Sequence, residues 1–249
     1  MFWQRVHNFP VLQTNQAHIW RARLDCDAQE IVKLTAILSP EEKARAARFV
    51  VRKAANSFII ARGVLRTLLA RYLNAEPQNL VFQQNQYGKI YLERMPLQFN
   101  VSHSQDLALF IFSWHQPVGI DVELMRIDSE FADIARKFFS KREVVELFSL
   151  PKEQQSRAFF NCWVCKEAFI KARGIGMYSA LNKFSVEVSP NANGRVRILY
   201  SDDEKETQSD KKWVLETLDP AVAGYVGAFV VGKEDEFVDC NASFYDFVI

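Results

Sequence analysis

Residues 140–172 have the sequence SKREVVELFSLPKEQQSRAFFNCWVCKEAFIKA, and this stretch decides the fold prediction. Ser140 is a typical N-cap residue, so a short helix is expected to begin there and a longer one to follow from residue 152. Four strand-like segments come next, and Asn193-Gly194 between two of them is typical of a hairpin turn. The second half of the chain therefore predicts a short helix, a long helix and then antiparallel strands.

The first half of the chain has the same order of elements. After a strand-like segment at 17–25, the stretch SPEEKARAARFV at 39–50 carries an N-cap serine with proline at the first helical position. Apolar residues near a 3.6-residue period predict a long helix over 53–73, and five short strand-like segments follow between 80 and 125. This order predicts an α+β fold rather than alternating βαβ units.

Two halves with one element order indicate a pseudo-twofold duplication. We predict two similar lobes, each a long helix packed on a small antiparallel sheet, with residues 1–116 in the N-terminal lobe and 117–249 in the C-terminal lobe with the acids. The charged segment 201–212 is predicted to be a solvated loop.

Composition and charge exclude several classes of protein. The chain has 249 residues, 49% of them hydrophobic, and its 31 basic and 30 acidic residues leave a formal charge of +1. A balance of this kind gives no overall field for nucleic acid or anionic membrane. The apolar run 107–112 is far short of the roughly 20 residues that span a bilayer. We expect a soluble, cytoplasmic protein with no nucleic-acid or membrane partner.

The pair Cys162 and Cys165 is the first chemical feature to weigh. A redox pair requires a cysteine at the start of a helix after a strand, and a zinc site requires two further ligands nearby. Neither context is present in the sequence, and the four cysteines of the chain form no disulfide framework. We expect both side chains to be buried as small hydrophobic residues.

A strand predicted at 118–125 carries two acids on one face. Its apolar residues alternate with Gly119, Asp121 and Glu123, which therefore share the opposite face. Two carboxylates at i and i+2 lie roughly 7 Å apart along a strand, and a hard divalent cation is the usual bridge between them. Gly119 is expected to leave room for a ligand. The alternative is a half-exposed strand with a polar outer face.

The long helix of the second half presents a third acid. Trp163, Glu167 and Lys171 stand four residues apart and share a face, while Lys166 lies about a quarter turn away. This face is either part of a site or a surface ion pair between Glu167 and Lys171, worth about 0.3 to 0.5 kcal/mol.

Three segments together resemble one known family. FNVSHS at 99–104, VGIDVE at 118–123 and WVCKEAFIK at 163–171 are similar, in order and separation, to the motifs of the Sfp-type 4′-phosphopantetheinyl transferases, the single-chain pseudodimeric form of the holo-acyl-carrier-protein synthase superfamily. Further matches are SPEEKARAARF, YGK and FFSKRE. The resemblance implies two similar α+β lobes with the active site at their interface.

The resemblance also implies the reaction. A serine of an apo acyl or peptidyl carrier protein attacks the β-phosphorus of coenzyme A, takes the 4′-phosphopantetheine arm and releases 3′,5′-ADP. By resemblance, Asp121, Glu123 and Glu167 hold Mg²⁺ against the pyrophosphate. Glu167 is the candidate general base, and Lys171, with Lys166 as a weaker candidate, offsets charge on the leaving phosphate.

Other matched positions are implied to bind coenzyme A. Ser102 and His103 are expected at the 3′-phosphate and adenylate end, and Lys89 is expected at the phosphates. Arg45 stands where a cationic 3′-phosphate ligand occurs in the family, whereas an earlier position that is basic in some members is Glu42 here. Arg62 is the expected substitute, since a guanidinium suits a phosphate.

Alternatives to this transferase remain open at this stage. The first is a non-catalytic module of the same fold that binds carrier protein or coenzyme A, and the second is a metal-dependent phosphohydrolase that uses water as nucleophile. A duplicated chain with an internal site needs no second copy, so we expect a monomer. The motifs do not specify which carrier protein or pathway is served, or whether acylated coenzyme A is accepted.

Overall fold

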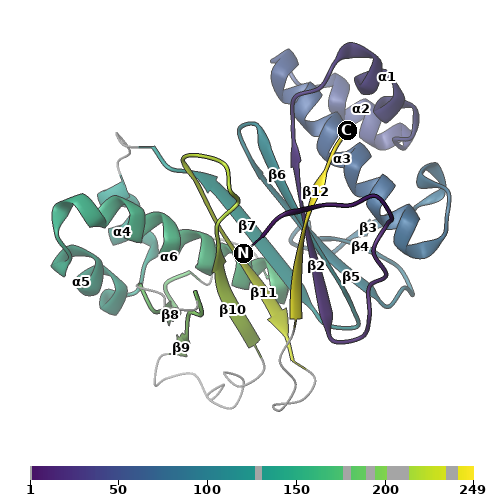
Figure 1. Cartoon of the computed structure of the whole chain (residues 1–249). Coiled ribbons are helices and arrows are strands. Elements are labelled where there is room, and N and C mark those ends of the chain that lie inside the picture. The colour runs from purple at the N-terminus through teal and green to yellow at the C-terminus, as the bar shows by residue number, and fades with distance from the viewer. Residues whose placement is uncertain (1, 127–130, 176–180, 189–193, 201–212, 234–240) are drawn as a thin grey trace.

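The computed structural model describes residues 2–126, 131–175, 181–188, 194–200, 213–233 and 241–249, and Figure 1 shows them in four layers. Two β-sheets form the middle of the molecule, and helices cover their outer faces. One outer layer contains α1 (Ala28–Ala36), α2 (Pro40–Ala47) and α3 (Arg52–Leu73), and the other contains α4 (Phe131–Phe138), α5 (Lys141–Ser149) and α6 (Lys152–Arg173). The predicted α+β class is confirmed.

The larger sheet has five strands. Their order is β1 (Gln4–Arg5), β12 (Asn241–Phe247), β2 (Gln16–Arg23), β6 (Leu107–Trp114) and β5 (Leu97–Ser104). Strands β2, β6 and β5 are antiparallel neighbours, whereas β12 is parallel to both β1 and β2. Helix α3 packs against one face of this sheet through a core that includes Trp20, Leu68 and Phe110.

The smaller sheet has three antiparallel strands. Their order is β10 (Trp213–Leu218), β11 (Tyr225–Gly232) and β7 (Val118–Leu124). Helix α6 covers its outer face, and apolar residues such as Ile19, Ile120 and Phe229 fill the space between the two sheets. The remaining elements are two short hairpins and a 3₁₀ turn, namely β3 (Phe82–Gln84) with β4 (Ile90–Leu92), β8 (Phe184–Val186) with β9 (Ile198–Tyr200), and η1 (Pro77–Asn79).

The predicted helix starts are visible as hydrogen bonds. Helices α2 and α5 each begin with a capping box, in which a serine accepts from the backbone of a glutamate three residues on and the glutamate side chain accepts from the serine backbone. These pairs are Ser39 with Glu42 and Ser140 with Glu143. The serine-led short helices are thereby placed as the sequence predicts.

Some elements were not predicted. Helices α1 and α4 and strands β1 and β12 are additions to the expected order, and β12 places the end of the predicted C-terminal lobe in the sheet of the N-terminal half. Asn193 of the predicted hairpin turn and the charged segment 201–212 lie outside the described residues. Within the described ranges, no helix is long and apolar enough to span a membrane.

Candidate active site

The two sheets meet edge to edge at β5 and β7, and side chains join them. Asn100, Ser102 and Ser104 alternate along β5 and therefore share a face. The Asn100 Oδ1 atom accepts from the backbone N–H of Ile120 at 2.9 Å. Ser102 Oγ donates to Asp121 Oδ1 at 2.7 Å, and Ser104 Oγ donates to Glu123 Oε2 at 2.8 Å. The serines thus orient both acids predicted from the strand pattern.

Helix α6 brings Lys171 to the same point. Its Nζ donates to Asp121 Oδ1 at 2.6 Å and to Ser102 Oγ at 2.9 Å, so three predicted site residues form one hydrogen-bonded group. The alternative prediction, a surface ion pair between Glu167 and Lys171, is wrong, because Lys171 pairs with Asp121 and Glu167 is buried.

The prediction that Gly119 leaves room for a ligand is wrong. A Cβ atom at this position would lie 2.0 Å from the backbone oxygen of Ala168 and 2.5 Å from the backbone nitrogen of Ala172. The space beside the glycine is filled by α6, whose backbone packs directly on β7. This close approach sets the distance between the acids of the strand and the polar residues of the helix.

Two carboxylate oxygens at the site have no partner among the described residues. Asp121 and Glu167 are only 3% and 5% exposed, and Asp121 Oδ2 and Glu167 Oε1 have no hydrogen-bond partner within the part of the chain that the structure describes. Burial, followed by the charge of Asp121, raises the pKa of Glu167 to about 7, although Lys171 opposes the change. The pKa of Glu123 is raised mainly by burial and then by Asp121. A buried unpaired carboxylate oxygen is costly, so this site favours the arrival of a cation.

The acids fit a hard cation by donor type. Mg²⁺ prefers oxygen ligands and keeps water and phosphate oxygens in its shell, and the two unpartnered oxygens offer such ligands. In the described residues, however, no group of three or more His, Cys, Asp or Glu side chains is already drawn together as a coordination sphere. The ammonium of Lys171 is instead the positive charge next to Asp121.

A cavity of about 280 Å³ opens beside this group. It lies where α3, the β3–β4 hairpin, β5 and the end of α6 meet, and its lining includes Arg62, Lys89, Asn100, Glu167 and Lys171. Groups from both halves of the chain therefore border one space, and Glu167 and Lys171 line it.

Cations gather near His103. The pKa of this exposed histidine is lowered mainly by partial desolvation and, to a smaller extent, by the positive charges of Lys171, Arg62 and Arg45. Arg45 and Arg62 lie against the same ring, that of Phe58, with Cζ atoms 5.1 and 5.6 Å from its centroid. Four residues predicted to contact coenzyme A, namely Arg45, Arg62, His103 and Lys171, are therefore close enough to interact electrostatically. Their combined positive charge suits the binding of an anion.

Family comparisons agree with this geometry. A family model described as the 4′-phosphopantetheinyl transferase superfamily matches residues 117–230, and one described as 4′-phosphopantetheinyl transferase, N-terminal, matches residues 23–113. The chain is 37% identical over 190 residues to 4′-phosphopantetheinyl transferase HetI of Nostoc sp., with 75% of this chain and 80% of the relative covered. The chain belongs to the 4′-phosphopantetheinyl transferase superfamily.

A second relative is similar over most of the chain. The 4′-phosphopantetheinyl transferase Sfp of Bacillus subtilis is 31% identical over 175 residues, which cover 70% of this chain and 76% of that protein. A solved structure of holo-[acyl-carrier-protein] synthase from Neisseria meningitidis aligns with a TM-score of 0.37 and 21% identity, over 47% of this chain and 98% of that chain. The resemblance predicted from the three motifs is thus confirmed at the level of the family.

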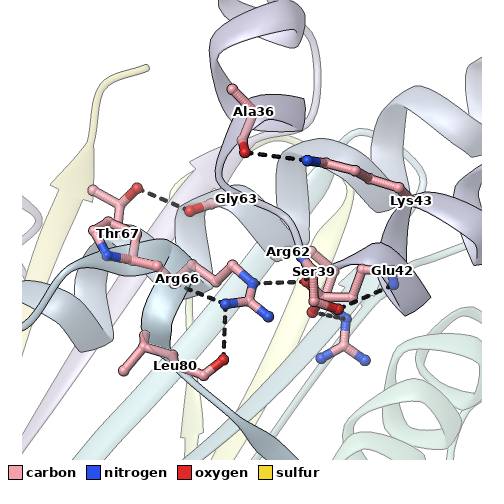
Figure 2. A network of polar contacts seen from close by, with 10 residues as sticks. Ala36, Ser39, Glu42, Lys43, Arg62, Gly63, Arg66, Thr67 and Leu80 are labelled. Carbon is pink, nitrogen blue, oxygen red and sulfur yellow. Dashed lines mark hydrogen bonds and ion pairs between the residues drawn. The ribbon is translucent and has the colours of Figure 1, made fainter.

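Glu42, where the resemblance suggested a cation, has a structural role in this chain. It is the glutamate of the α2 capping box, and its Oε2 accepts from Arg66 Nε at 2.6 Å (Figure 2). Arg62 Nε lies 4.0 Å from the other carboxylate oxygen. Glu42 therefore holds α2 against α3, and Arg62 reaches the cavity from beside it.

The weaker candidate Lys166 is not part of the site. Its side chain is fully buried, and Nζ donates to both carboxylate oxygens of Glu143, at 2.7 and 2.8 Å, and to the backbone oxygen of Phe184 at 2.6 Å. Its ammonium joins α5 to α6. All three of its N–H donors are used there, so Lys166 does not take the role at the leaving phosphate that the resemblance implied.

The cysteine pair is buried, as predicted. Cys162 and Cys165 are free and each is 1% exposed, and burial raises the pKa of both thiols. The polar residues that sequence reasoning missed are Asn100 and Ser104. Their spacing of two residues on either side of Ser102 was the available signal, because a strand places all three on one face.

Proposed function

We propose that this protein transfers the 4′-phosphopantetheine arm of coenzyme A to a serine of an apo acyl or peptidyl carrier protein and releases 3′,5′-ADP. One observation carries the proposal. Glu167 and Lys171 line a cavity bordered by both halves of a chain of this superfamily, and Lys171 donates to Asp121, while Asp121 and Glu167 each keep a buried oxygen that lacks a partner among the described residues.

Three carboxylates are proposed to hold the metal. Asp121, Glu123 and Glu167 supply hard oxygen donors, and the serines of β5 fix the orientation of the first two. When bound, Mg²⁺ supplies Lewis-acid stabilisation of the pyrophosphate oxygens. Ser102 is fully engaged by Asp121 and Lys171, so its hydroxyl acts on the acids rather than on a phosphate.

The chain's own residues account for the group transfer. The serine oxygen of the carrier forms a bond to the β-phosphorus of coenzyme A as the bond from that phosphorus to the 3′,5′-ADP oxygen breaks. Glu167 takes the proton of the serine hydroxyl, since its side chain lines the cavity and burial raises its pKa to about 7. Lys171 offsets the charge on the departing 3′,5′-ADP. Arg45, Arg62 and His103 bind its 3′-phosphate end.

A duplicated architecture is part of this proposal. The strand order β2-β6-β5 matches β7-β11-β10 in both sequence order and antiparallel pairing. In each set, a capped short helix and a 22-residue helix lie in the chain after the first strand and before the other two. We assign residues 1–116 together with β12 to the N-terminal lobe and the rest to the C-terminal lobe. A site between lobes of one chain requires no second copy, which supports a monomer.

The intact mass of an apo carrier protein tests the function. The carrier is incubated with this protein, coenzyme A and Mg²⁺, with a parallel sample containing EDTA. A gain of one phosphopantetheine arm that EDTA prevents is the expected result. No gain on acyl and peptidyl carriers with coenzyme A intact would instead identify a non-catalytic binding module, and release of 3′,5′-ADP without a carrier would identify a hydrolase.

A further inference from the structure

The β3–β4 turn lies against the C-terminal end of α6, although the two are more than 80 residues apart in the chain. Lys89 Nζ donates to the backbone oxygens of Lys171, Ala172 and Val118, at 2.7, 3.1 and 3.2 Å. An ammonium has three N–H donors, and all three are used here. Lys89 therefore has no donor left for a phosphate in this structure.

Two of these oxygens belong to the last turn of α6. The last four carbonyl groups of a helix have no partner within it and carry the negative end of the helix dipole. A buried ammonium on these groups satisfies them and offsets that partial charge. Burial lowers the pKa of Lys89 to about 8, which leaves the amine mostly protonated at neutral pH.

Asn85 adds a second contact to the same helix end. Its Nδ2 donates to the backbone oxygen of Gly174 at 2.8 Å, while its Oδ1 accepts from the backbone N–H groups of Tyr87 and Lys89 at 2.9 and 3.0 Å. Gly174 has a φ of 65°, and a Cβ there would lie 3.1 Å from Asn85 Nδ2. The turn and the helix end are thus fitted closely to each other.

We propose that Lys89 and Asn85 form a clamp on the end of α6 that positions Lys171 and Glu167 for the transfer, so that Lys89 is a positioning residue and not a ligand of coenzyme A. Lys171 connects the two functions directly, because its backbone oxygen is held by Lys89 while its Nζ contacts Asp121. The inference rests on the proposed function and revises the phosphate-binding role predicted for Lys89.

Lys89→Met removes the ammonium and keeps an unbranched side chain one atom shorter. Lys43→Met is the matched control, since Lys43 also donates to a carbonyl in the last turn of a helix, that of Ala36 in α1 (Figure 2), and neither residue lines the cavity. Asn85→Asp keeps the acceptor that shapes the turn and replaces the donor to Gly174 with a negatively charged oxygen, so it serves if Lys89→Met does not fold.

Hydrogen exchange of the metal-free, coenzyme A-free protein is measured first. The amides of Gly174 and Ile175, bonded to oxygens of Lys171 and Ile170, are expected to exchange at least about tenfold faster in Lys89→Met. Asn85→Asp gives a smaller rise of about threefold, and Lys43→Met gives none. This measurement does not depend on catalysis, so it decides on the clamp even if no transfer is ever observed.

Kinetics then separate positioning from binding. For the clamp, kcat of Lys89→Met falls by about tenfold while KM for coenzyme A stays within about threefold, and Lys89→Arg recovers part of the loss. Unchanged exchange together with a tenfold rise in KM would make Lys89 a substrate ligand and overturn the inference. Unchanged exchange with unchanged kinetics would overturn it as well.

Discussion

Helices α3 and α6 have the same length and the same internal anchor. Each has 22 residues, and fourteen residues after its first it carries a buried cation, Arg66 in α3 and Lys166 in α6. Each cation pairs with the glutamate of a capping box, Glu42 or Glu143. The two helices are thus fixed to their short neighbours by one device.

The residue directly after the buried cation differs between the two helices, Thr67 in α3 and Glu167 in α6. Thr67 Oγ1 donates to the backbone oxygen of Gly63 within α3, whereas Glu167 at the same position of α6 keeps an oxygen without a partner among the described residues. The two helices therefore share the anchoring ion pair but differ at the residue after it, and of these two residues only Glu167 of α6 belongs to the site.

The spacing between helix and sheet also differs. Tyr72 of α3 lies over its sheet, and its hydroxyl is shared by His18 Nδ1 at 2.9 Å and Trp20 Nε1 at 2.7 Å. Ala172 stands at the same position of α6 and packs on Gly119 of β7. A polar aromatic cluster thus fills the first interface, and a direct backbone contact forms the second.

Removal of the anchor in α6 is expected to have the largest effect on stability. Lys166→Met leaves the buried carboxylate of Glu143 unpaired, which lowers the free energy of unfolding by about 3 to 5 kcal/mol. Urea unfolding measures this loss. The double variant Lys166→Met with Glu143→Leu should recover part of it, since Glu143 also accepts from the backbone N–H groups of Ser140 and Val186, and a double variant as unstable as the single one would contradict the pairing.

Acid sensitivity is expected to depend on the α3 interface. Burial lowers the pKa of His18 to about 4, against 6.5 for the unperturbed group, so between these values the unfolded chain binds more protons than the folded one. The contribution of His18 is complete above pH about 6.5 and declines as the pH falls to about 4, by about 3 kcal/mol in all.

Denaturation curves at several pH values, compared with those of His18→Asn, isolate this contribution. Other acidic groups titrate in the same range and contribute equally in both proteins. The difference in unfolding free energy between the two proteins at each pH therefore reports on His18 alone. A difference that stays constant from pH 7 to 4 would contradict a neutral buried histidine.

The backbone contact of α6 is tested by Gly119→Ala. The added Cβ has no space beside Ala168 and Ala172, so α6 must move away from β7. We expect a loss of about 2 kcal/mol in unfolding free energy, as in other overpacked cores. The rate of transfer should fall too, because Lys171 moves with the helix. A variant as stable and active as the wild type would contradict the tight packing.

The cysteines of α6 are expected to give the smallest effect. Cys162→Ala and Cys165→Ala each remove a buried sulfur and should cost about 1 kcal/mol of stability. Transfer by the folded variants should match the wild type within about twofold. A stable variant without activity would show that these thiols take part in chemistry.

The local order of elements could be predicted from sequence, and the long-range contacts could not. The 3.6-residue period predicted α3 to within one residue, the long helix expected from residue 152 is α6, and serine caps predicted the starts of α2 and α5. Strand β12 was missed because its place depends on pairing with β2, more than 200 residues away. Helix α1 had a readable N-cap, Asp27, whose side chain accepts from Glu30.

The same limit applies to the site. Period 2 correctly placed Asp121 and Glu123 on one face of β7 with Gly119, but it could not show that a helix backbone covers the glycine. Lys166 pairs with Glu143, which lies 23 residues away on another helix. The motif does not contain this contact, so the motif alone wrongly suggested that Lys166 lies at the site. The contacts of Lys89 likewise depend on a helix end that is distant in sequence.

The central claim is that α6 carries the chemistry at a position where α3 does not. The most direct measurement is the initial rate of phosphopantetheine transfer to an apo carrier protein by the wild type, Glu167→Gln and Thr67→Ala. We predict a loss of about 10³-fold for Glu167→Gln at unchanged fold, and a rate within about twofold of the wild type for Thr67→Ala. Wild-type turnover by a folded Glu167→Gln variant would contradict the account.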